Sequence, residues 1–222
     1  MQNLLRHTSV AVLSGLLFWL FWISRPTWSW DMRLWKAFGD ASFLLLFFTL
    51  IIGPLVRIWP PIAKIMPWRK YLGIWFGLIA IIHGFLVWDG WARWDILRLL
   101  GYEFVPQLGR VARMEPGFGL SNIIGLIALV LTFVLMATST DWALKYLGKS
   151  WKWLHYSAHI IFYLSAIHAA YFLYMHYTVS FHKNVPPPDW FRIPFLILVG
   201  IVFLLQWIAF VKTVRSRRTK IK

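Results

Sequence analysis

The sequence predicts an all-α fold, an integral membrane bundle of six transmembrane helices that takes in the whole chain, residues 1–222, as one domain. Hydrophobic residues make up 59% of the chain and charged residues 14%, whereas soluble domains carry about 25% charged residues. The mean hydropathy is +0.63, and six apolar stretches approach the ~20 residues that a membrane-spanning helix needs. We expect the spans at about 10–24, 41–56, 71–88, 117–138, 153–175 and 191–211.

The distribution of charge predicts the orientation of these helices. Six alternating spans place the N-terminus, the 2–3 loop, the 4–5 loop and the C-terminal tail on one side, with 14 basic residues and one acid, Asp141. The opposite side has nine basic residues and seven acids. Because basic loops stay in the cytoplasm, we expect both termini to be cytoplasmic.

The net charge of +15 therefore follows topology and does not indicate nucleic-acid binding. We expect the basic tail at 212–222 to lie against anionic membrane lipid, with docking of an acidic cytoplasmic partner as the alternative. The longest external connection, 89–116, has an amphipathic rhythm over 91–100 that predicts a helix lying flat on the membrane surface.

The chain has no cysteine, which excludes disulfides, iron–sulfur clusters, covalent c-type haem and thiol chemistry. Any redox role therefore needs a cofactor that is not covalently attached.

Histidines are the informative polar residues of the predicted spans. Away from the span ends, the only ionisable side chains besides tyrosine are His83 on span 3 and His155, His159 and His168 on span 5. Ionisable groups in hydrocarbon are costly and usually functional. One isolated histidine would most often be structural, but four on two spans favour a cofactor. With no acid, lysine or arginine beside them, a proton pump or transporter is disfavoured, whereas facing neutral imidazoles suit bis-histidine haem.

Depth selects one pair of these histidines. At 1.5 Å per residue, His83 lies ~18 Å from the cytoplasmic start of span 3. Span 5 also runs outward, which places His155 near the inner surface and His168 ~20 Å further out. His83 and His168 therefore share a depth near the outer leaflet, and we predict them as the axial iron ligands of one haem b.

The roles of His155 and His159 stay open. At the level of His155, span 3 offers only Arg69 and Lys70, which are not haem ligands. His155 could share a second haem with His159, contact a flavin or a quinone, or only donate a hydrogen bond. On one ideal helix His155 and His168 would point ~140° apart, so a kink or two separate cofactors is required. Three further histidines are expected to be ordinary interfacial residues, namely His7, His176 and His182.

Four short segments of the chain are distinctive: Arg-Lys-Tyr-Leu-Gly-Ile-Trp from Arg69, Ile-Ile-His ending at His83, Thr-Ser-Thr at 138–140, and Leu-Gly-Lys-Ser-Trp-Lys-Trp-Leu-His ending at His155. With them the chain resembles the MsrQ (YedZ) family of the ferric reductase-like transmembrane superfamily. A second histidine, His168, follows the last motif after thirteen residues. The likeness covers all six spans in order.

This resemblance implies a haem b subunit in a bacterial inner membrane. It would take electrons from a cytoplasmic flavin reductase or from quinone. It would pass them to a periplasmic molybdopterin enzyme, an MsrP-like subunit that reduces methionine sulfoxide in damaged proteins. It also implies His83 and His168 as iron ligands, His155 as a third matching histidine, and FMN as a possible cofactor. Such a chain is an electron-transfer subunit of an oxidoreductase system and need not turn over a substrate alone.

Two alternatives remain. His159 stands where the family has an aromatic residue, and Arg-Met-Glu-Pro-Gly-Phe at 113–118 replaces the family's Arg-Pro-Tyr. The chain could therefore be a stand-alone ferric reductase-like cytochrome b with another periplasmic acceptor. The other alternative, a cofactor-free scaffold, leaves the four intramembrane histidines unexplained.

Overall fold

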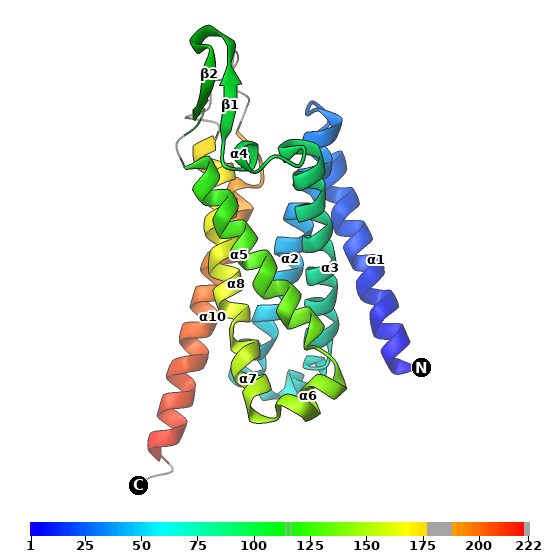
Figure 1. Cartoon of the computed structure of the whole chain (residues 1–222). Coiled ribbons are helices and arrows are strands. Elements are labelled where there is room, and N and C mark those ends of the chain that lie inside the picture. The colour runs from blue at the N-terminus through cyan, green and yellow to red at the C-terminus, as the bar shows by residue number, and fades with distance from the viewer. Residues whose placement is uncertain (114, 116, 177–187, 220–222) are drawn as a thin grey trace.

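The structure is a computed structural model that describes residues 1–113, 115, 117–176 and 188–219 (Figure 1). His182 and the last three residues of the basic tail lie outside this part of the chain. Six helices are long and apolar enough to cross a membrane, at Gln2–Ile23, Trp30–Ile58, Trp68–Ala92, Phe118–Ala137, Lys149–Met175 and Arg192–Arg218. The predicted all-α membrane bundle of six spans is confirmed.

Four spans are uninterrupted α-helices, namely α1 (Gln2–Ile23), α2 (Trp30–Ile58), α5 (Phe118–Ala137) and α10 (Arg192–Thr219). In the third span, α3 (Trp68–Leu86) continues into a π-helical turn at Val87–Ala92. The fifth span consists of α7 (Lys149–Tyr156), α8 (Ala158–Ala170) and a π-helical turn at Tyr171–Met175. Shorter elements join the spans: α4 (Ile96–Leu99), α6 (Asp141–Leu147) and 3₁₀ turns at Pro60–Ile65 and Pro106–Leu108.

Both chain ends lie at one end of the bundle, and a β-hairpin projects from the other (Figure 1). We call these the termini end and the hairpin end. Strand β1 (Tyr102–Val105) pairs antiparallel with β2 (Arg110–Arg113). The hairpin was not predicted, and of the surface helix expected over 91–100 only the single turn α4 is present. Strands of four residues are too short for alternation to stand out, although Gly109, at φ +60°, was a turn signal.

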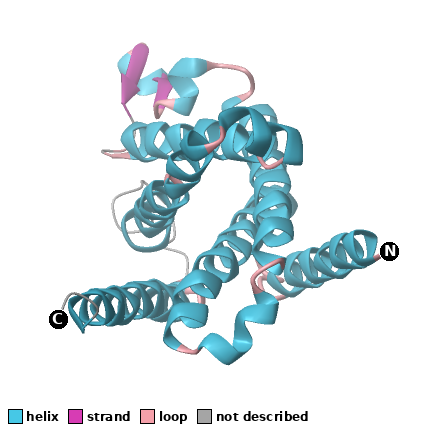
Figure 2. Ribbon diagram, turned by 90° about the horizontal axis from the view of Figure 1, so that it is seen from below, coloured by secondary structure: helices cyan, strands magenta, loops and turns pink. Residues whose placement is uncertain are grey.

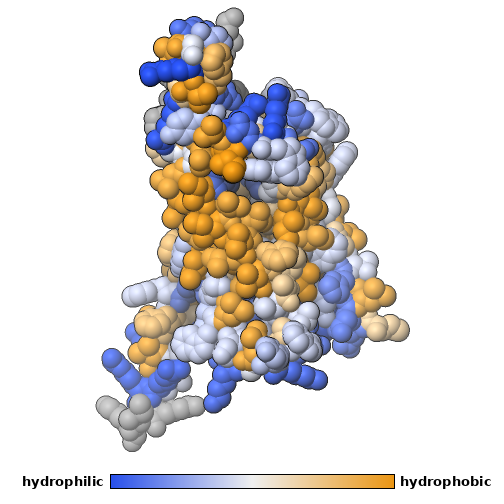
Figure 3. Space-filling model, in the orientation of Figure 1, coloured by the Kyte–Doolittle hydropathy of each residue, from blue (hydrophilic) through white to orange (hydrophobic). Residues whose placement is uncertain are grey.

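Helix α2 is the centre of the bundle and is the most buried of the six spans. It packs against α1, α3, α8 and α10, and its Leu45, Leu46 and Leu50 are fully buried. Viewed along the bundle, α1 and α10 lie on the outside of the group (Figure 2). The outer surface is an apolar belt between polar ends (Figure 3). Large side chains such as Leu16, Leu120 and Phe203 are more than half exposed there, as expected for a surface that faces lipid.

Three spans extend well beyond their predicted bounds. Helix α1 begins at Gln2 and not near residue 10. Helix α2 was expected from residue 41 but begins at Trp30, so Lys36 and Asp40 lie inside the spanning helix. Charged residues are tolerated there because each has a partner of opposite charge, as described below. Helix α10 continues to Thr219, beyond the apolar stretch, because lysine and arginine are good helix formers once they are outside the hydrocarbon.

The fifth span is broken at Ser157, between α7 and α8. The Ser157 hydroxyl donates a hydrogen bond to the Leu154 carbonyl at 2.6 Å, and such bonds compete with the regular helix pattern. His155 therefore lies on α7 and His168 on α8. The 140° separation expected for one ideal helix does not apply to two helices with a break between them.

Candidate cofactor site

A cavity of about 600 Å³ lies among α2, α3, α5 and α8 and reaches the segments at the hairpin end. This volume falls within the ~300–1,000 Å³ of ordinary ligand and cofactor sites. Its walls are mainly aromatic and aliphatic, and they include Phe43, Phe76, Phe118 and Phe172. His83 and His168 both line it, so the structure brings together the two histidines that share a predicted depth.

His83 is held by a backbone carbonyl of α2. Its Nδ1 lies 2.9 Å from the carbonyl oxygen of Trp35. A carbonyl only accepts hydrogen bonds, so Nδ1 carries the proton and Nε2 keeps a free lone pair. Gly39 makes the approach possible, because a Cβ there would lie 3.1 Å from Cε1 of the imidazole.

His168 is held in the same way by α5. Its Nδ1 lies 2.8 Å from the carbonyl oxygen of Ser121, so its Nε2 also keeps a free lone pair. A Cβ at Gly125 would lie only 2.7 Å from this Nδ1. Glycine at that position is therefore required by the ring of His168.

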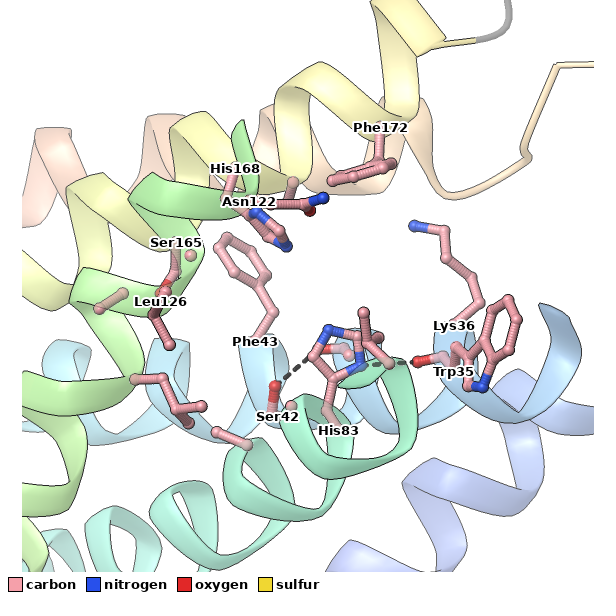
Figure 4. Close-up of a pocket in the computed structure, with 18 of the residues that line it drawn as sticks. Trp35, Lys36, Ser42, Phe43, His83, Asn122, Leu126, Ser165, His168 and Phe172 are labelled. Carbon is pink, nitrogen blue, oxygen red and sulfur yellow. Dashed lines mark hydrogen bonds between the residues drawn. The ribbon is translucent and has the colours of Figure 1, made fainter. Parts of the chain in front are cut away.

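The two imidazoles project into the same open space from opposite helices (Figure 4). Within the described residues no group of three or more histidines, cysteines or acids could hold a metal ion. Two histidines alone suit a metal that brings its other ligands with it, as haem iron does in its porphyrin. The free Nε2 lone pairs and the apolar walls therefore fit a b-type haem, and the Nδ1 bonds are the supporting contacts that histidine ligands usually have.

His155 does not line this cavity. Its Nε2 lies 3.3 Å from the Thr138 hydroxyl oxygen, and its ring stacks on Trp151 with centroids 3.9 Å apart. The Trp151 indole in turn donates to the Thr138 carbonyl at 2.8 Å. His155 is thus part of a polar cluster at the termini end.

His159 also lies outside the cavity. Its Nδ1 is 3.1 Å from the amide nitrogen of Gln206 on α10, and the Gln206 oxygen accepts from Tyr163 at 3.0 Å. Because the amide nitrogen donates, the Nδ1 lone pair of His159 is already used. The structure therefore gives both inner histidines protein partners, and a cofactor role for either stays a prediction.

His176 was expected to be an ordinary interfacial residue, but in the structure it is one of the side chains that line the cavity. It lies beside Phe172, and its Nδ1 lies 2.9 Å from Oε2 of the buried Glu115. Tyr171 also donates a hydrogen bond to Glu115. Glu115 and His176 are 61 residues apart in the sequence, so no local pattern could have predicted the contact.

An ionic cluster lies at the hairpin end of the bundle, and two of its members, Lys36 and Asp40, line the cavity. Arg25, only 3% exposed, has its Nη2 2.6 Å from Asp40 and 2.9 Å from Asp189. The amine of Lys36 lies 3.1 Å from the other oxygen of Asp40 and 3.6 Å from Asp189. We call these four residues the ionic cluster. In the predicted topology all four belong to the nine basic residues and seven acids on the side opposite the termini, and their mutual pairing was not predicted.

Charges in this cluster stabilise one another. Burial alone would lower the pKa of Arg25, but Asp40 and Asp189 outweigh it and raise that pKa above its usual value. Burial alone would raise the pKa of Asp189, but Lys36 and Arg25 hold it below its ordinary range. These shifts favour the charged forms of Arg25 and Asp189, and removing one of the two leaves a buried charge with one partner fewer.

Comparisons with known proteins agree with this arrangement. The family described as "Ferric reductase like transmembrane component" matches residues 38–159, more than half of the chain. A protein of Bordetella pertussis named "Protein-methionine-sulfoxide reductase heme-binding subunit MsrQ" is 33% identical over 133 residues, which are 60% of this chain and 58% of that protein. No solved structure matches.

Two further relatives carry the same name. One, from Enterobacter sp. (strain 638), is 29% identical over 161 residues, 70% of this chain and 74% of that protein. The other, from Salmonella paratyphi B, is 30% identical over 155 residues, 68% of this chain and 71% of that protein. The chain thus matches somewhat over half of the Bordetella relative and more of the other two.

Proposed function

The chain belongs to the ferric reductase-like transmembrane family, in the branch of the MsrQ proteins, and from that premise we propose that it is a haem b subunit of a bacterial inner membrane. It carries electrons from a cytoplasmic flavin reductase, or from quinone, to a periplasmic molybdopterin-dependent methionine sulfoxide reductase. The relatives' printed names support the haem and the reductase system.

The observation that carries this proposal is the pair of imidazoles in the cavity. His83 and His168 each donate from Nδ1 to a backbone carbonyl, at 2.9 Å and 2.8 Å, and each keeps the Nε2 lone pair for iron. Haem, when bound, supplies a centre that gains and loses one electron reversibly. The carbonyl bonds fix the ring orientation and raise the basicity of the ligand nitrogens.

We propose one haem in each chain. His83 and His168 supply one pair of free Nε2 lone pairs, which is enough to bind one haem iron. His155 and His159 each have a hydrogen-bond partner in the protein instead. These two inner histidines lie on the side where the donor approaches, and a flavin such as FMN or a quinone is the donor chemistry that fits a cysteine-free chain.

The direction of transfer follows from charge. The termini end carries most of the basic residues, so it is proposed to face the cytoplasm. The cavity reaches the segments at the hairpin end, so the haem is proposed to lie on the periplasmic side of the membrane. The apolar walls of the cavity exclude water from the imidazoles, which lowers the local dielectric and the reorganisation that a charge change requires.

Reoxidation of the reduced chain tests the proposed function. The purified protein is reduced with a flavin reductase and NADH, and haem reoxidation is followed after adding the periplasmic reductase of the same organism with methionine sulfoxide. We expect reoxidation only when enzyme and sulfoxide are both present, and none after His168→Ala. Equally fast reoxidation by ferric citrate without that enzyme would favour the stand-alone cytochrome and contradict the proposal.

A further inference from the structure

The cavity wall contains a single strong cation. Among the described residues that line it, Lys36 is the only lysine or arginine, and Asp40 is the only acid. Lys36 follows Trp35, whose carbonyl holds His83. Its amine points into the open space between His83 and Phe172 (Figure 4).

The contacts within the ionic cluster do not use all the N–H donors of the Lys36 ammonium. Asp40 is matched twice, by Arg25 at 2.6 Å and by Lys36 at 3.1 Å. Asp189 accepts from Arg25 at 2.9 Å and from the backbone N–H of Phe191 at 3.0 Å. An ammonium has three N–H donors, and within the part of the chain that the structure describes Lys36 makes one hydrogen bond of normal length, to Asp40. The remaining donors face Asp189, at 3.6 Å, and the cavity.

A b-type haem brings two carboxylates into this cavity. Both are on one edge of the macrocycle, and an ionised carboxylate in an apolar cavity is costly unless a cation or several donors meet it. Apart from the histidines, the polar side chains of the remaining walls are neutral, namely Ser42, Asn122, Thr132 and Ser165. These walls are otherwise mainly apolar rings and aliphatic chains such as Phe43, Phe76 and Leu126. The carboxylate edge therefore belongs at the Lys36 end, and the apolar edge among those side chains.

We infer that Lys36 binds a carboxylate of the bound tetrapyrrole, and that Asp40, Arg25 and Asp189 position its amine for this contact. The inference rests on the proposed haem site. Asp40 holds the lysine amine from within the same helix, four residues on. Arg25 pairs with Asp40 from outside α2, and Asp189 in turn pairs with Arg25. Lys36 thereby sets which edge of the cofactor faces the hairpin end.

The test compares haem b with haem b dimethyl ester, whose two carboxylates are neutral. Each is loaded into the full-length wild-type chain and into Lys36→Gln, and its dissociation rate is measured by transfer to excess apomyoglobin. Lys36→Arg keeps the charge, and Lys70→Gln is the control because Lys70 pairs with Asp141 at the termini end. The ester in the wild-type chain tests the contact without altering the protein.

We expect haem b to leave Lys36→Gln roughly tenfold faster than wild type, as the loss of one charge-assisted hydrogen bond requires. The ester should leave wild type about equally fast, Lys36→Gln should not accelerate its loss further, and Lys36→Arg should restore most of the retention. An equal acceleration for haem and ester would show a structural role only and overturn the inference. So would equal retention of haem and ester by the wild-type chain. A wild-type chain that binds neither would instead refute the proposed function.

Discussion

Replacing Gly125 by alanine tests the packing that aims His168 into the cavity. A Cβ at this position would lie 2.7 Å from Nδ1 and 2.8 Å from Cε1 of the imidazole. Both distances are shorter than van der Waals contact, so the ring must move or α5 must shift away from α8. Because Nδ1 is also 2.8 Å from the Ser121 carbonyl, a moved ring loses that hydrogen bond as well.

Gly125→Ala should affect haem affinity more than the free energy of unfolding. Alanine in a helix is more stable than glycine by about 0.5–1 kcal/mol. Overpacking costs about 1–3 kcal/mol, and the lost hydrogen bond costs about 0.5–1.5 kcal/mol. The net destabilisation of the fold is therefore about 0.5–4 kcal/mol, which is less than the ~5–15 kcal/mol that stabilises a typical folded protein. A displaced ring moves the Nε2 of His168 away from the position in which it would bind the haem iron. We therefore expect the affinity for haem to fall at least tenfold.

Gly200→Ala is the matched control, because a Cβ at Gly200 on α10 meets nothing within 4 Å. Both variants are purified in detergent, and the haem-to-protein ratio, the absorbance spectrum and the thermal midpoint are measured. We expect Gly200→Ala to keep its haem and Gly125→Ala to lose most of it while staying monodisperse. Full haem content with an unchanged spectrum in Gly125→Ala would refute the reasoning.

Three further predictions concern the ionic cluster and the inner histidines. Asp189→Asn leaves Arg25 buried with one partner fewer, so thermal or denaturant unfolding should show a loss of about 3–5 kcal/mol; a loss below 1 kcal/mol would contradict the cluster's role. The pKa of Asp189 is lowered from 3.8, so its contribution to stability is complete above about pH 3.8 and is lost as the pH falls through the folded value. Acid titrations followed by haem release should therefore be steeper below pH 4 in wild type than in Asp189→Asn, and equal slopes would count against the ion pairs. Finally, His155→Ala and His159→Ala should keep one haem in each chain, since both side chains lie outside the cavity; loss of haem in either variant would place a cofactor at the termini end.

Much of the fold could be predicted because the bilayer restricts the choices. Backbone polar groups in hydrocarbon must be paired within a helix, so six apolar stretches predict six spanning helices, and the described residues form six helices that could cross a membrane. The histidines were informative for the same reason. Ionisable side chains are rare in the predicted spans, so His83 and His168 stand out as candidate cofactor ligands. The helical rise per residue alone places both at the same depth.

What the sequence did not reveal depends on contacts between distant residues. Arg25 and Asp189 are 164 positions apart, and nothing near either residue marks it as buried. Lys36 and Asp40 were placed outside the second span because hydropathy windows end at a charge, whereas a paired charge can continue the helix inward. Glu115 and His176 meet only through the folded hairpin end.

The most direct test of the central claim is the reduced-minus-oxidised absorbance spectrum and the haem-to-protein ratio of the purified chain. These are measured beside the same quantities for His83→Ala and His168→Ala. We predict a b-type spectrum with one haem in each wild-type chain and its loss in both variants, with the variants still folded. A folded wild-type chain without haem, or two variants that keep the full b-type signal, would contradict the account.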